Sequence, residues 1–79
     1  MLHEREDYQR IQDPAGKIGE NEPVFLVRAQ DILAPEIMRL WAMLHRVQGG
    51  DPHMSELVEK HAEKTKQWQG THGCRIADL

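Results

Sequence analysis

The sequence predicts a mainly α fold: an antiparallel two-helix hairpin with one short strand, a minimal α+β arrangement, and an N-terminal arm. Three observations predict it. Apolar residues recur at helical spacing over residues 33–47, and they do so again over residues 54–68. Between these two segments lie residues 49–52 (GGDP), which end one helix and start the next. A link this short forces the second helix to fold back along the first.

The first helix, expected over residues 34–48, is apolar around more than half of its girth. Asp31 is a suitable N-cap, and Gly49 suits the left-handed position that follows a helix. One apolar stripe repeats at steps of four and three residues, and a second apolar line flanks it. The stripe comprises Leu33, Ile37, Leu40, Leu44 and Val47, and the flanking line comprises Ala34, Met38 and Trp41. One neighbouring helix cannot cover this surface, so we expect the strand, another subunit or a target protein to cover the excess.

The second helix is expected to start with Asp51 as N-cap and Pro52 as its first residue, and to end at Gly70. Its outer face carries acidic and basic residues at spacings of three and four, which is typical of a solvated surface. Its inner stripe is expected to comprise Met54, Leu57, Val58, His61, Ala62, Thr65 and Trp68.

The remaining segments complete a single small domain of residues 1–79. Residues 1–23 are expected to form an arm and loop, residues 24–29 (VFLVRA) a strand, residues 31–68 the hairpin, and residues 69–79 a tail. An unpaired strand needs a partner. We expect it to pair with the C-terminal segment 74–79, with residues 16–19, or with the same strand of a second chain.

Length and composition limit the classes of function. A chain of 79 residues has a thin core, and small domains usually compensate with disulfides, a metal or association. Cys74 is the only cysteine, which rules out an internal disulfide and fits a reducing compartment. The sequence offers no membrane span and no signal peptide, so we expect a cytoplasmic protein without a membrane partner. A net charge of −3 argues against general nucleic-acid binding.

Residues 22–31 (EPVFLVRAQD), followed by Leu33-Ala34-Pro35 and Trp41-Ala42, resemble short proteins encoded by bacteriophages and prophages. The resemblance covers the middle of the chain and the Trp68-Gln69 end of the second helix. It implies a context rather than an activity, namely a small accessory protein in the host cytoplasm. Such proteins often bind and block host factors, including defence components, or sequester small signalling nucleotides.

We predict a non-enzymatic protein without cofactors, because no catalytic constellation is recognisable. The first hypothesis is protein–protein binding, both to a host protein and to further copies of the chain, with a dimer favoured. The surplus apolar surface of the first helix motivates it. The expected interface comprises Leu33, Ile37, Met38, Leu40, Trp41 and Leu44.

The first alternative is an oligomer that sequesters a small anionic nucleotide. Arginines would hold the phosphates across subunits, and an aromatic ring would stack on the base. The candidate ligand-binding residues are Arg28, Arg39, Trp41, His45 and Arg46. The competing interpretation of these arginines is a solvated helix edge with surface ion pairs.

The second alternative is a small metal-binding protein. The candidate ligands are His61, His72 and Cys74, but His72 and Cys74 lack the paired spacing that is usual for zinc ligands. We therefore predict no bound metal.

Overall fold

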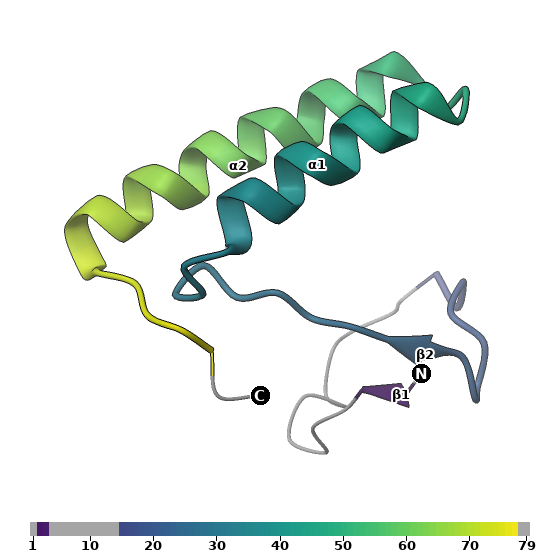
Figure 1. The fold of residues 1–79 in the computed structure, drawn as a ribbon. Coiled ribbons are helices and arrows are strands. Elements are labelled where there is room, and N and C mark those ends of the chain that lie inside the picture. Colours follow the sequence, from purple (N-terminus) through teal and green to yellow (C-terminus); the bar gives the residue numbers. More distant parts are fainter. Residues whose placement is uncertain (1, 4–14, 78–79) are drawn as a thin grey trace.

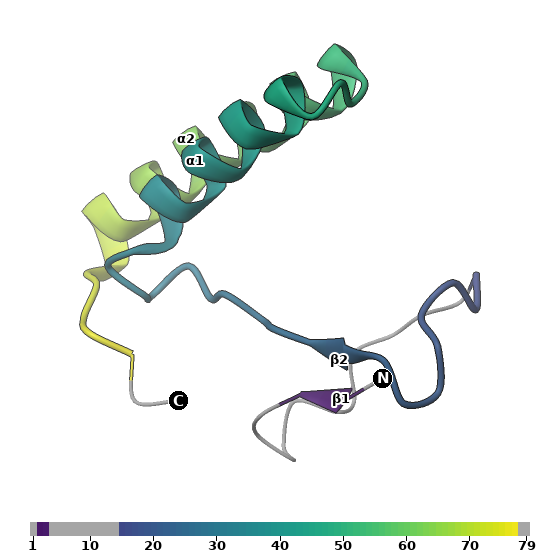
Figure 2. The same cartoon turned by 45° about the vertical axis from the view of Figure 1, so that its right-hand side comes forward.

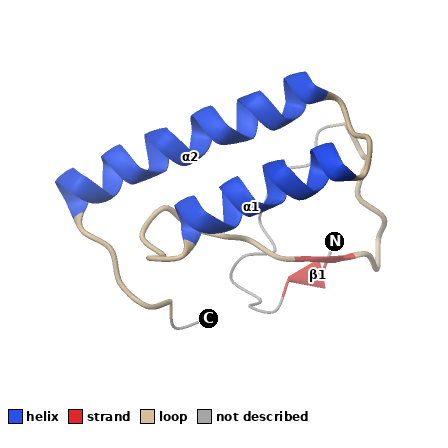
Figure 3. Ribbon diagram, turned by 45° about the horizontal axis from the view of Figure 1, so that its top comes forward, coloured by secondary structure: helices blue, strands red, loops and turns tan. Residues whose placement is uncertain are grey.

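The computed structural model describes residues 2–3 and 15–77, which form two helices and two very short strands. Their order is β1 (Leu2–His3), β2 (Pro23–Val24), α1 (Ala34–Val47) and α2 (Pro52–His72). Figures 1 and 2 show α1 and α2 side by side, with the two strands set apart from the hairpin beyond an extended segment. Figure 3 shows the same separation of helices and strands. The predicted fold class, a mainly helical hairpin with a short strand, is confirmed.

The start of α1 differs from the prediction. The N-cap residue is Leu33, and no side chain caps this end of the helix. Asp31 instead closes the turn that precedes α1, because its Oδ1 accepts a hydrogen bond from the Leu33 N–H at 2.9 Å. The Asp31 carbonyl accepts another from the Ala34 N–H at 2.9 Å. The buried Asp31 side chain therefore orders the approach to the helix rather than its first turn.

The start of α2 is as predicted, whereas its end is not. Asp51 caps α2 by accepting a hydrogen bond from the His53 N–H at 3.0 Å, and Pro52 is the first helical residue. The helix continues through Gly70 to His72, and Gly73 ends it with a φ of 83°. A glycine inside a helix costs only about 1 kcal/mol, so Gly70 alone does not stop it.

The strand is shorter than predicted and has a different partner. Only Pro23 and Val24 of this region are in a ladder, and they pair in parallel with Leu2 and His3. Within the described residues, neither the C-terminal segment nor residues 16–19 form a ladder with it, and pairing with the same strand of a second chain stays a prediction. The expected arm at the N-terminus otherwise falls on residues 1 and 4–14, which lie outside the described residues.

The tail after α2 pairs with the turn before α1. The Arg75 N–H donates to the Gln30 carbonyl at 2.8 Å, and the Ile32 N–H donates to the Arg75 carbonyl at 2.9 Å. The Gln69 side chain reinforces this junction from α2 by donating to the carbonyls of Ala29 and Asp31 at 2.9 and 2.8 Å. The open end of the hairpin is thus closed by hydrogen bonds rather than by apolar packing.

The two helices pack through small side chains. The fully buried apolar residues are Ala34, Ala42 and Ala62, and Ser55 and Thr65 are buried beside them. Met38 is half-buried, and its sulfur atom lies 3.7 Å from the hydroxyl oxygen of Thr65. The predicted inner stripe of α2 is therefore only partly right: Ala62 and Thr65 are buried and Val58 is half-buried. The larger members Met54, Leu57, His61 and Trp68 are exposed.

Two ion pairs join one edge of the hairpin. Arg39 Nη2 lies 3.5 Å from Glu63 Oε2, and Arg46 Nη1 hydrogen-bonds to Glu59 Oε1. The hydrogen bond from Arg46 lowers the pKa of the Glu59 carboxyl and raises the pKa of the Arg46 guanidinium. These side chains are partly exposed, so the pairs fix the register of the helices more than they stabilise the fold.

The short link between α1 and α2 packs against the side chain of His45. The His45 ring stacks on the Trp41 ring, with centroids 4.6 Å apart, and its Nε2 is buried. A Cβ atom added to Gly50 would lie 2.2 Å from that nitrogen. The link therefore requires a residue without a side chain at position 50.

Gly50→Ala is expected to lower the free energy of unfolding by about 1–3 kcal/mol, because the added methyl group would push His45 off Trp41. Gly70→Ala is the matched control. It meets no atom within 4 Å and replaces a helical glycine, so it should raise the same free energy by roughly 0.5–1 kcal/mol. Urea unfolding of both variants measures this. Equal midpoints for the two variants would contradict the close approach.

The Arg46–Glu59 pair predicts a loss of stability in acid. Because the pKa of Glu59 is lower in the folded chain than in the unfolded chain, its contribution is present above the ordinary glutamate pKa of about 4.3. This contribution to stability is lost as the pH falls through the lowered pKa of Glu59. An NMR titration should find the Glu59 carboxyl titrating below the usual range, and returning to it in Arg46→Gln. A usual pKa in the unsubstituted protein would refute the pairing.

Candidate interaction surface

The outer face of α1 is apolar over almost its whole length. We define this face by Ile37, Leu40, Trp41, Met43, Leu44 and Val47, all of which are exposed. Leu40 and Met43 are each 52% exposed, and Val47 is 73% exposed. At 100° per residue these six side chains span an arc of roughly 160°, opposite the arc that contacts α2. Glu36 is the only charged residue of α1 within this arc.

Apolar surface continues from this face in two directions. A cleft of about 570 Å³ runs between the helices, lined by Met38 of α1 and by Leu57, Val58 and His61 of α2, among others. At the N-terminal end of α1, a second cleft of about 440 Å³ brings Ile37 together with other apolar residues. These are Phe25, Ile32, Leu33, Ile76 and Ala77. The outer face is therefore the centre of a larger apolar surface.

This surface is large for so small a protein. Six side chains of this size, each about half exposed, present roughly 600 Å² to solvent, given 150–250 Å² for a whole aromatic side chain. That area lies at the upper end of the range found for the largest apolar patch on a typical monomeric protein, and such patches are often functional.

Of the residues predicted to form an interface, five are accessible. Leu33, Ile37, Leu40, Trp41 and Leu44 are exposed, and Met38 is half-buried between the helices. The residues predicted to form an interface are therefore accessible to a partner. The identity of that partner stays a prediction. Sequence reasoning omitted Met43 and Val47 from the interface. The signal for Met43 was its position beside the main apolar stripe, on the side away from the flanking line.

The residues predicted to bind a nucleotide lie on different parts of the hairpin. Arg39 and Arg46 are on the edge that contacts Glu63 and Glu59, whereas the stacked rings of Trp41 and His45 lie away from that edge. Arg28 is exposed in the segment between β2 and α1. A nucleotide site built from all five would need a second chain, so it stays a prediction.

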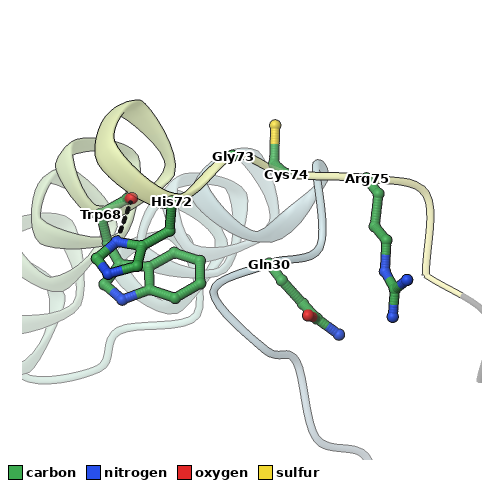
Figure 4. Close-up of a pocket in the computed structure, with 6 residues that line it drawn as sticks. All are labelled: Gln30, Trp68, His72, Gly73, Cys74 and Arg75. Carbon is green, nitrogen blue, oxygen red and sulfur yellow. Dashed lines mark hydrogen bonds between the residues drawn. The ribbon is translucent and has the colours of Figure 1, made fainter.

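A polar cleft of about 350 Å³ lies at the C-terminal end of α2 (Figure 4). The rings of Trp68 and His72 form its aromatic wall, stacked with centroids 4.2 Å apart. His72 Nδ1 lies 3.1 Å from the Trp68 carbonyl. Gln30 and Arg75 complete the cleft from the hydrogen-bonded junction described above, so their backbones are held in place.

The candidate metal ligands are not brought together. His61 lines the cleft between the helices, while His72 and Cys74 line the polar cleft. In Figure 4 the Cys74 sulfur points away from the other labelled side chains. Over residues 2–3 and 15–77, no three histidine, cysteine, aspartate or glutamate side chains form a group that would hold a metal ion.

Comparison with known proteins adds no assignment. No family model, no curated protein and no solved structure matches the chain. Within the described part of the chain, neither helix has the length and apolar character needed to cross a lipid bilayer.

Proposed function

We propose that this protein acts by binding another protein through the outer face of α1, and that it is not an enzyme. The proposal depends on one observation, namely that α1 buries its small side chains and exposes its large apolar ones. Its small residues Ala34 and Ala42 contact α2, while its six large apolar residues face solvent. Exposing that much apolar area is unfavourable unless a partner covers it.

The character of the face favours a protein partner over a small molecule. The outer face is the convex side of a helix and carries no converging polar groups, which a small-molecule site would need for orientation. An apolar helical face suits a groove or another helix, with anchors spaced at i, i+3, i+4 and i+7. The Arg39–Glu63 and Arg46–Glu59 pairs provide a polar rim along one side of it.

A narrower form of the proposal is that the partner includes a host protein, such as a component of a defence system. Its support is the resemblance of residues 22–31 to short phage-encoded proteins. The resemblance supplies a context, and the outer face of α1 supplies a surface through which blocking would occur.

Site-specific photo-crosslinking tests the proposal. A photoreactive amino acid replacing Met43, on the outer face, is expected to crosslink to protein in the cells that normally contain this chain. The matched control replaces Gln67, which is exposed on the opposite, polar face of α2 and should give little product. Mass spectrometry of the products identifies what lies on the face. Equal yields from the two positions would contradict the proposal.

A second candidate function, binding of a small anionic ligand with a planar ring, is favoured by the polar cleft. Arg75 offers a guanidinium for a phosphate, and the Trp68–His72 stack offers an aromatic surface for a base. In this candidate the ligand would lie at the end of α2 rather than at the arginines of α1.

Calorimetry with cyclic dinucleotides and ADP-ribose-type nucleotides tests this candidate. If the cleft binds them, Arg75→Gln should weaken binding by about tenfold, because it removes one charge-assisted hydrogen bond worth roughly 1.5 kcal/mol. Lys66→Gln removes a positive charge from an exposed residue outside the cleft and should leave binding unchanged. An absence of heat with every nucleotide would exclude the candidate.

A further inference from the structure

In the part of the chain that the structure describes, no large side chain is fully buried. Among the described residues, the fully buried apolar side chains are three alanines, and the largest side chain that is fully buried is that of Ser55. The large apolar side chains of α1 lie outside instead. A domain of this size needs more buried apolar area than alanines supply. The missing core would form if the outer face met another apolar helix.

The spacing on the outer face is self-complementary. Ile37, Leu40, Leu44 and Val47 follow steps of three, four and three residues, which is the heptad spacing of packed helices. Two copies of α1 that run in opposite directions would pair Ile37 with Val47 of the partner subunit, and Leu40 with Leu44 of the partner subunit. The twofold axis then passes near position 42, and all four layers lie within the helix.

The charges of α1 favour the antiparallel orientation. Its first turn carries Glu36, and its last turn carries His45 and Arg46. An antiparallel pair brings the acidic start of each helix beside the basic end of the other, and it opposes the two helix dipoles. A parallel pair would align the two helix dipoles and place both acidic starts at the same end. No charged side chain has to be buried between the four apolar layers.

The available area matches what a stable dimer needs. Two outer faces of roughly 600 Å² each would bury about 1,200 Å², the lower limit for specific protein interfaces. The flanking apolar residues Met54 and Leu57 of α2 are also exposed and would extend the contact. With α2 packed on the other side of each α1, the result is a four-helix bundle.

We infer that the partner of the outer face is a second copy of this chain, in an antiparallel twofold dimer. This inference rests on the proposed function, because it names the protein that the face binds. It makes α1 a central helix, covered by α2 on one side and by α1 of the partner subunit on the other.

Sedimentation velocity tests whether a second copy of the chain covers the outer face of α1. The unsubstituted chain is expected to sediment with the mass of two chains at concentrations of about 100 µM, well above the Kd expected of a specific interface of this area. Leu40→Glu places a charge at the centre of the face and should reduce the mass to that of one chain. Gln67→Glu adds the same charge to the polar face of α2 and should stay dimeric. Circular dichroism checks that both variants remain helical.

Disulfide trapping tests the orientation and remains decisive if Leu40→Glu unfolds. In a Cys74→Ser background, a mixture of Leu40→Cys and Leu44→Cys chains should form mainly mixed disulfides. Either variant alone should form at least tenfold less. Efficient crosslinking of each variant with itself would overturn the antiparallel arrangement.

Two further outcomes would overturn the inference. One is a monomeric unsubstituted chain, and the other is a Leu40→Glu variant that is still a folded dimer. If the chain is monomeric but Met43 crosslinks to a different protein in cells, the second copy is excluded while the proposed function stands. If the crosslinking yield at position 43 does not exceed the yield at position 67, both the dimer and the proposed function are excluded.

Discussion

The close contact between α1 and α2 through alanine, serine and threonine is the constraint on which the rest of the structure depends. The fully buried side chains of the hairpin are small, namely Ala34, Ala42, Ala62 and Ser55, and Met38 is half-buried between the helices. The leucines of α1, Trp41 and Met43 are exposed on its far side. Close-packed small residues gain little from the hydrophobic effect, because they bury little area. Hydrogen bonds close the open end of the hairpin, and its large apolar side chains remain available to a partner.

The two ends of the hairpin are fixed by different interactions. At the closed end, the His45 ring packs over Gly50, and Asp51 caps α2. At the open end, the Gln69 amide and the backbone bridge between Asp31 and Arg75 hold the tail against the turn before α1. Because both ends are tied, the outer face of α1 is presented in a defined orientation. A pre-organised surface loses less conformational entropy on binding than a flexible one.

Sequence reasoning predicted the hairpin, its link and the start of α2, because these depend on local signals such as Asp51-Pro52 and Gly49. It misplaced the contact side of α2, since small residues such as Ser55 carry almost no hydropathy signal. It took Asp31 as a helix cap and Gly70 as a stop. Asp31 instead closes the turn before α1, and α2 continues through Gly70 because a single helical glycine costs only about 1 kcal/mol. The accessible face of α1 was predictable because apolar residues cover more than half of the circumference of this helix. The pairing of Arg39 and Arg46 with glutamates was foreseen only as the competing interpretation, because it depends on which edges of the helices meet.

Each helix carries one tryptophan stacked on a histidine four residues later, and the chain contains no other tryptophan. Trp41 belongs to the outer face of α1, and Trp68 lines the polar cleft at the end of α2. The emission of an indole responds to the polarity around it and to the ring stacked on it. The molecule therefore contains an optical probe at each of its two candidate binding sites, and chains that retain one indole would report on the two sites separately without any attached dye.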